Sequence, residues 1–191
     1  MKKAILTGAV IAAMTTMGAA HAVTTPNNTG QIKFTGAIAA ASCDMNVVVS
    51  GVVQPGGVVD LGVWTITDVS AVGGFGNAVK IQLQPDVATC DVDPSGLTTA
   101  FIKIDTATTA SSNTDVVTSP ETASTKVGVT FTMEDDSSIV NQPGSALTLA
   151  SDPNVDAATG AIKFKARPYA LSEFIEGGII GGSVNYTVAY N

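Results

Sequence analysis

Cys43 and Cys90 are the residues whose type and spacing point most directly to a chemical reaction, the oxidation of two thiols to a disulfide. The bond would join residues 47 positions apart, and the chain-entropy model then gives it about 4 kcal/mol of stabilisation. Disulfides persist in oxidising compartments, so the prediction depends on where the chain is sent. The alternative, two buried free thiols, suits a reducing compartment better.

The first 22 residues, MKKAILTGAVIAAMTTMGAAHA, indicate export to an oxidising compartment. Lys2 and Lys3 precede an apolar run that ends in Ala20-His21-Ala22, which is typical of a secretory signal peptide cleaved after Ala22. A membrane anchor is the alternative, but it requires about twenty predominantly apolar residues and usually a basic flank after them. Here the next charge is Lys33, so we expect cleavage and a disulfide.

The sequence contains few residues that could form a catalytic site. His21 is the only histidine and leaves with the signal peptide, which excludes Ser-His, Cys-His and His-ligated metal sites from the mature chain. Glu134-Asp135-Asp136 is the densest acidic group, and it follows a strand pattern and precedes serines, so a solvated turn is favoured over a weak Ca²⁺ site. Trp64 lies in an apolar run and is better explained by core or sheet-face packing than by a sugar platform. We therefore expect no enzyme, cofactor or metal.

The mature chain of 169 residues carries seven basic against sixteen acidic residues, a net charge of −9. Nucleic acids and anionic membranes bind basic patches. The local basic cluster is Lys163, Lys165 and Arg167 at strand spacing, which indicates a solvated strand face. No nucleic-acid partner is expected.

Short runs rich in Val, Ile, Thr and Phe alternate with Gly, Pro, Asn, Asp and Ser, which is typical of β-strands and turns. The predicted strands are QIKFTGAIAA, MNVVVSGVV, GNAVKIQLQ, TTAFIKID, KVGVTFTME, SALTLAS, GAIKFKARPYA and SVNYTVAYN. No convincing amphipathic helix interrupts them, so an all-β antiparallel sandwich is predicted. The small and polar stretch between Asp105 and Lys126 is expected to form a surface loop or hairpin rather than core.

The C-terminal segment alternates up to its last residues. The apolar and glycine face is Gly178, Ile180, Gly182, Val184, Tyr186, Val188 and Tyr190, with Ser183, Asn185 and Thr187 between. Such a period of two predicts a half-buried strand. Because chain ends normally fray, a partner must hold this strand in place.

Several of these segments resemble those of a known family. GQIKFTGAIAAASC, VKIQLQPDVATC, IKFKARPYA and the SVNYTVAYN end, with penultimate Tyr190 and with Gly178 fourteenth from the C-terminus, resemble subunits of chaperone-usher fimbriae, similar to the pilins of type 1 and P fimbriae. The resemblance covers the whole mature chain. It implies an incomplete immunoglobulin-like β-sandwich that lacks its last strand and is completed by a donor strand from another chain.

The resemblance also implies the partners and the sites. A periplasmic pilus chaperone and then the arm of a neighbouring pilin fill the groove, an outer-membrane usher exports the subunits, and a homopolymer forms a fimbrium on the bacterial surface. The groove would be lined by Gly178, Ile180, Val184, Tyr186, Val188 and Tyr190, and the chaperone would grip the carboxylate of Asn191.

The donor strand would be residues 23–35, between the signal peptide at 1–22 and the pilin domain at 36–191. Its alternate residues Asn28, Gly30, Ile32 and Phe34 share one face, and Gly30 suits a close backbone approach. Alternatively, Ile32 and Phe34 belong to the first strand of the subunit's own core. We expect both to be partly true.

One departure from the family pattern is Pro168 in ARPYA, where relatives often have two aromatic residues. Proline lacks the N–H that a sheet ladder needs, so we predict an edge strand or a bulge there.

Three functions are compared. The leading one is a structural fimbrial subunit, a shaft pilin that polymerises by donor-strand exchange. An adhesive pilin, whose own surface loops bind a host receptor, is the closest alternative, and a jelly-roll carbohydrate-active enzyme is supported only by the β-rich composition.

Overall fold

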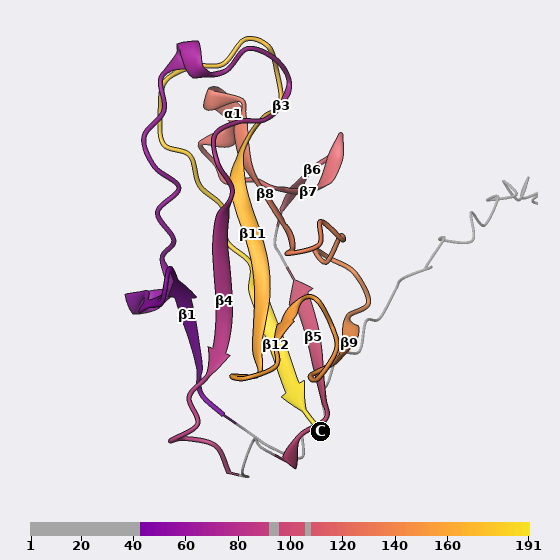
Figure 1. Cartoon of the computed structure of the whole chain (residues 1–191). Coiled ribbons are helices and arrows are strands. Elements are labelled where there is room, and N and C mark those ends of the chain that lie inside the picture. The colour runs from indigo at the N-terminus through magenta and orange to yellow at the C-terminus, as the bar shows by residue number, and fades with distance from the viewer. Residues whose placement is uncertain (1–42, 92–95, 106–107) are drawn as a thin grey trace, which may run out of the picture. The chain divides into compact units, whose positions relative to one another are not determined.

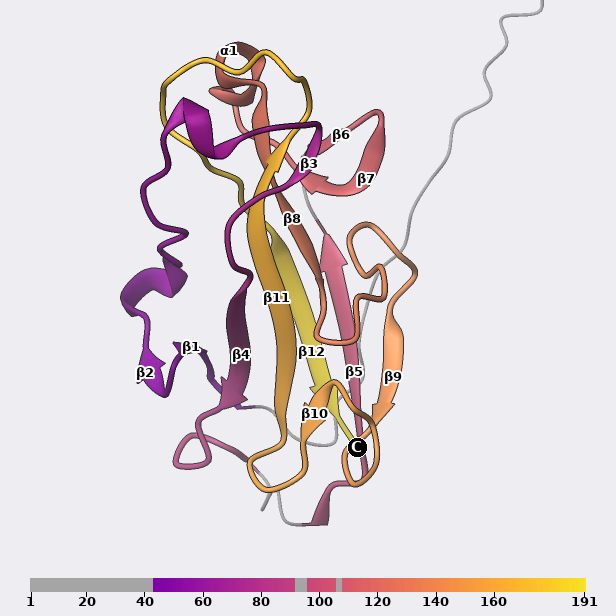
Figure 2. The same cartoon turned by 45° about the horizontal axis from the view of Figure 1, so that its top comes forward.

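The computed structural model describes residues 43–91, 96–105 and 108–191. Within them the regular secondary structure is mainly antiparallel β-strand, arranged in two sheets (Figure 1). The larger sheet has the order β2-β1-β4-β11-β8-β7-β6, and β3 and β10 also pair with β11. The smaller sheet has the order β12-β5-β9, and Figure 2 shows β5 lying between its two neighbours.

The element bounds follow the turn residues of the sequence. The strands of the larger sheet are β1 (Met45–Val49), β2 (Val52–Val53), β3 (Gly73–Gly74), β4 (Val79–Pro85), β6 (Thr109–Ala110), β7 (Asn113–Val117), β8 (Val127–Met133), β10 (Val155–Asp156) and β11 (Ala161–Ala170). The smaller sheet contains β5 (Thr99–Asp105), β9 (Ser145–Thr148) and β12 (Asn185–Tyr190). The short helices are η1 (Pro55–Gly57), η2 (Ile66–Asp68) and α1 (Thr122–Thr125). None of the helices in these ranges is both long and apolar enough to cross a membrane.

The core lies between the two sheets. Ala100, Ile102 and Ile104 alternate along β5 and are fully buried, and they join the same cluster as Ile81, Leu83, Ile162 and Phe164 of the larger sheet. Alternating side chains of each strand therefore face inward, as the period of two predicts. The all-β class expected from the sequence is confirmed.

The prediction that MNVVVSGVV forms a single strand is wrong. Ser50 and Gly51 have φ values of 52° and 78°, and Val49 pairs with Val52 across them. Two consecutive residues with positive φ make a tight hairpin whose twist matches that of its strands. The run is therefore a hairpin of β1 and β2, because Gly51 adopts the left-handed region without a steric cost.

The segment between Asp105 and Lys126 contributes more to the core than its composition suggests. It contains the β6–β7 hairpin, and a hairpin was one of the two structures predicted for it, the other being a surface loop. However, β7 also pairs with β8 and buries Val116 and Val117, at 0% and 2% exposure. These two residues are core, contrary to prediction, because Val117 packs in the buried cluster and Val116 lies against Gly128 of β8.

The edge position predicted for the strand around Pro168 is also wrong. β11 is an interior strand, with β4 on one side and β8 on the other. The carbonyl of Pro168 accepts a hydrogen bond from the Phe75 amide at 3.0 Å, so the missing N–H of Pro168 faces the same side. There the chain between Gly74 and Val79 has two more residues than the stretch of β11 that it faces. The irregularity is thus in the neighbouring segment 74–79 of the same chain. β11 itself runs without a bulge against β8.

Candidate functional site

The disulfide between Cys43 and Cys90 is confirmed, with an S–S distance of 2.09 Å. Cys43 precedes β1 and Cys90 follows β4, and these strands are neighbours. Next to the bond, the Asp86 amide donates to the Asp44 carbonyl at 2.7 Å and the Asp44 amide donates to Thr89 Oγ1 at 2.9 Å. The bond therefore holds together the two chain segments at this end of the β1–β4 pair.

An apolar groove of about 1190 Å³ opens into the core between two segments distant in sequence. One wall comes from residues 53–64 and the other from residues 178–186. The floor is formed by strands of both sheets and consists of Ile81, Leu83, Ile104, Val117, Val129, Phe131, Phe164 and Ala166. Since most of the floor residues also belong to the buried cluster, the groove is a place where no described segment covers the core.

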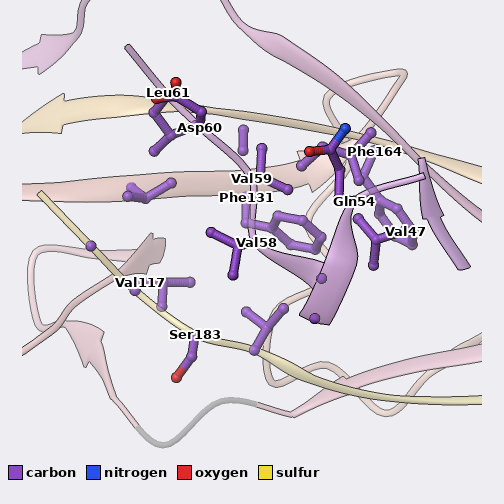
Figure 3. Close-up of a pocket in the computed structure, with 18 of the residues that line it drawn as sticks. Val47, Gln54, Val58, Val59, Asp60, Leu61, Val117, Phe131, Phe164 and Ser183 are labelled. Carbon is purple, nitrogen blue, oxygen red and sulfur yellow. The ribbon is translucent and has the colours of Figure 1, made fainter. Parts of the chain in front are cut away.

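Two stacked aromatic rings occupy the middle of this floor. Phe131 and Phe164 lie 5.1 Å apart between ring centroids, with their planes 24° apart. Figure 3 shows the Phe131 ring in the pocket, with Val117 and Ser183 toward one end and Val47 and Gln54 toward the other. The rings give the groove a firm apolar base.

The first wall was not assigned by the sequence reasoning. Gly56 and Gly57 have φ values of 66° and 69° and turn the chain after β2. Val59 and Leu61 then pack against the core, while the Asp60 carboxylate accepts the Gly62 amide at 2.8 Å. The alternation of Val59 and Leu61 was an available signal for an extended segment, but no local pattern indicates what lies across from it.

Trp64 ends this wall and is a groove residue, half-buried rather than core. Its indole N–H donates to the Leu61 carbonyl at 3.0 Å, and its ring meets Phe75 edge-on with centroids 5.9 Å apart. A Cβ on Gly76 would lie only 2.3 Å from the indole. The glycine therefore provides the space in which the tryptophan ring lies.

The second wall is glycine-rich because it passes close to other chain segments. A Cβ on Gly178 would lie 2.7 Å from Cγ2 of Thr125, and a Cβ on Gly182 would lie 2.9 Å from Cγ1 of Val117. Any side chain at either position would force a neighbour to move. This contact gives a physical reason for a glycine fourteenth from the C-terminus.

Strand β12 presents one unpaired edge beside the groove. Asn191 and Thr99 exchange both backbone hydrogen bonds, at 2.9 and 3.0 Å, so by the alternation of an antiparallel ladder Ala189, Thr187 and Asn185 also direct their amides and carbonyls to β5. The backbone groups of Tyr186, Val188 and Tyr190 point the opposite way. In the described part of the chain β12 pairs with β5 alone, and its free edge therefore offers a ladder to an added strand.

The predicted groove residues divide into two sets. Gly178, Ile180, Val184 and Tyr186 line the groove. Val188 lies half-buried against the core, and Asn191 accepts backbone hydrogen bonds from Thr98 and Thr99. Val188, Tyr190 and Asn191 thus lie further along the chain and are not among the residues that line the groove.

Tyr190 packs into the core at the C-terminal end of β12, with 3% of its surface exposed. Its hydroxyl donates to the Gly160 carbonyl at 3.1 Å. Burial raises the pKa of Tyr190 to about 12. The penultimate tyrosine is thus a neutral side chain that ties β12 to the turn before β11.

The acidic turn and the basic strand face pair with each other. Glu134 contacts Lys80 at 2.7 Å and Lys163 at 3.7 Å, and Asp136 contacts Lys165 at 2.7 Å. The hydrogen bond from Lys80, followed by the charges of the nearby lysines, lowers the pKa of Glu134. Within the ranges that the structure describes, no group of three or more His, Cys, Asp or Glu is placed to hold a metal ion.

The proposed donor residues Asn28, Gly30, Ile32 and Phe34 lie outside the described residues, as does the predicted signal peptide.

Comparisons with known proteins agree with this geometry. The family model "Fimbrial protein" matches residues 32–191, and no curated protein matches the chain. The fold is similar to the P pilus rod subunit PapA, with a TM-score of 0.56 at 12% identity over 85% of this chain and 100% of that one. It is also similar to a chaperone-usher pilus subunit, with a TM-score of 0.50 at 16% identity over 87% of this chain and 98% of that one.

Proposed function

Since the chain belongs to the fimbrial protein family, as a structural subunit of a surface fibre, we propose that it polymerises by donor-strand exchange. In this mechanism residues 23–35 of one subunit, the N-terminal arm, enter the groove of the preceding subunit. The arm pairs with the free edge of β12 and covers the core from outside.

The observation that carries the proposal is that, among the described residues, one edge of β12 has no partner strand and the core beside it has no cover. Burying one Val, Ile or Phe side chain contributes about 1.5–3 kcal/mol, and a net backbone hydrogen bond contributes about 1 kcal/mol. A strand that buries several apolar side chains and completes the ladder would thus contribute as much as the roughly 5–15 kcal/mol that stabilise a whole domain. Without such a strand the subunit is incomplete.

An uncovered groove also explains the need for assembly partners. Exposed strand edges next to apolar surface promote edge-to-edge aggregation. A periplasmic chaperone that lends a strand would protect the subunit until an outer-membrane usher presents it to the growing fibre. The same chain then supplies both arm and groove, so the product is a homopolymer.

The proposed role is structural and requires no catalytic centre. The adhesive alternative located receptor binding in the segment between Asp105 and Lys126. That segment buries Val116 and Val117 in the core and pairs with β8, which favours a structural role for it.

Deletion of residues 23–30 tests the mechanism. The shortened subunit keeps its groove, so it should still be captured by the chaperone, but it cannot donate a strand and fibres should stop growing. Chaperone complexes and fibres are measured side by side for the deletion and the full chain. Polymerisation of the shortened chain at the normal rate would refute donor-strand exchange.

A further inference from the structure

The unpaired edge of β12 and the alternation of the N-terminal arm together define how the two strands align. We propose that the arm runs antiparallel to β12 with Gly30 directly opposite Tyr186 of the preceding subunit. The remaining inward pairs are then Asn28 with Val188, Ile32 with Val184 and Phe34 with Gly182. This inference rests on the proposed function and adds the register, which the sequence left open.

The direction follows from the rest of the fold. Every ladder among the named strands of the described residues is antiparallel, and antiparallel pairs are slightly more stable per residue than parallel ones. An antiparallel arm on the free edge continues the order of the smaller sheet.

The choice of face follows from the hydrogen-bond direction of β12. Tyr186 and Val188 direct their backbone groups to the free edge and their side chains to the core face, because they pair with the buried residues Ile104 and Ile102. Residues directly opposite each other in a ladder share a face. The inward residues of the arm must therefore lie opposite Tyr186 and Val188, and the possible registers differ by steps of two residues.

The sizes of the side chains select one register. Tyr186 is the aromatic residue of the wall, at 40% exposure, and a glycine opposite it leaves room for the ring to cover the backbone. Gly182 passes so close to Val117 that a Cβ would lie 2.9 Å from Cγ1 of that residue, so no side chain covers the backbone at this point, and the ring of Phe34 opposite Gly182 can cover it. Both pairs match an aromatic residue with a glycine, a recognised way of covering glycine in sheets.

A shift by two residues in either direction loses both matches. In one direction Gly30 would oppose Val188 and Phe34 would oppose Val184. In the other Gly30 would oppose Val184, and Phe34 would oppose Ile180. Either shift takes the aromatic partner away from both glycines. Either shift also sets large side chains against each other, Ile32 against Tyr186 in the first and Phe34 against Ile180 in the second, contrary to the alternation of large and small residues that packs a core well.

Four double-cysteine variants test the register. Each combines one arm residue, Thr29 or Gln31, with one exposed β12 residue, Asn185 or Thr187, whose side chains face away from the core. In the proposed register Thr29 lies opposite Thr187 and Gln31 lies opposite Asn185. On this edge both are non-hydrogen-bonded pairs, with Cα atoms about 4.5 Å apart, which suits a disulfide. The two mismatched combinations are diagonal at about 7–8 Å.

Fibres of each variant are isolated, oxidised and boiled in SDS without reductant. Thr29→Cys with Thr187→Cys, and Gln31→Cys with Asn185→Cys, should give ladders of covalent oligomers that collapse to monomer on reduction. The two mismatched variants should form fibres equally well but run as monomers. The four chains differ only in pairing, so each serves as a control for the others.

Other patterns overturn the register and identify its replacement. A ladder from Thr29 with Asn185 alone, or from Gln31 with Thr187 alone, indicates a shift by two residues in one or the other direction. Ladders from both mismatched variants indicate a parallel arm. Fibres without any ladder indicate either a shift larger than two residues or an arm that does not pair with β12, and both outcomes overturn the register. These results leave donor-strand exchange standing, whereas failure of the unmodified chain to form fibres contradicts the proposed function itself.

Discussion

Val188→Asp tests whether the last strand completes an apolar face that must be covered. Val188 pairs with Ile102, whose side chain is fully buried, and packs half-buried against the core. The substitution removes an apolar side chain and introduces a carboxylate on the same face. In the chaperone complex and in the fibre an added strand would bury this position further.

The cost combines two effects. Loss of the half-buried valine removes about 1 kcal/mol, and a carboxylate buried without a partner costs several kcal/mol, part of which it avoids by taking up a proton. We expect a total of about 3–5 kcal/mol. This is a large share of the roughly 5–15 kcal/mol that stabilise a domain, so the pilin should be degraded before assembly.

Thr187→Asp is the matched control, with the same new charge one residue earlier. Thr187 is exposed, faces the other side of the sheet and lies opposite Lys103, so the change should stay within about 0.5 kcal/mol. Each variant is co-expressed with the chaperone at matched level, and the complex recovered by pull-down is quantified. Equal recovery of both variants and the unmodified chain would show that Val188 is not on a face that assembly needs.

Three further predictions concern the disulfide, the penultimate tyrosine and the glycine wall. Cys43→Ser removes about 4 kcal/mol and should lower the periplasmic yield sharply; thiol labelling of the denatured, unreduced parent should find no free thiol, and two would contradict the bond. A buried Tyr190 with a pKa of about 12, against about 10 when unfolded, contributes stability that is fully present below about pH 10. This stability should fall by up to about 3 kcal/mol as the pH rises to about 12, and Tyr190→Phe should remove that part of the fall; an unchanged alkaline slope in urea unfolding would refute it. Gly178→Ala places a Cβ 2.7 Å from Thr125 and should cost about 1–3 kcal/mol, whereas Gly177→Ala meets nothing within 4 Å; equal melting temperatures of the two variants would contradict the close approach.

Local patterns in the sequence were sufficient for several features. The alternation along residues 184–190 predicted which side chains of β12 face inward, because a strand has a period of two whatever its neighbours are. The disulfide between Cys43 and Cys90 followed from two cysteines and an export signal. These features depend on the chain's own covalent geometry and chemistry, so no knowledge of the fold was required.

Features that depend on a partner strand were not predictable in this way. The position of Pro168 inside the larger sheet is possible only because the chain between Gly74 and Val79 bends away from it. Val116 and Val117 became core through their pairing with β8. Neither partner lies near in sequence, and no local pattern names it.

The groove shows the same division. The sequence by itself determined one wall, residues 178–186, and the direction in which its side chains point. The tertiary structure alone brought residues 53–64 opposite that wall and set the Phe131–Phe164 stack between them. It also left the outer edge of β12 without a partner among the described strands. A groove exists only between segments, and long-range strand pairing, which decides which segments meet, is a property of the whole chain rather than of any stretch within it.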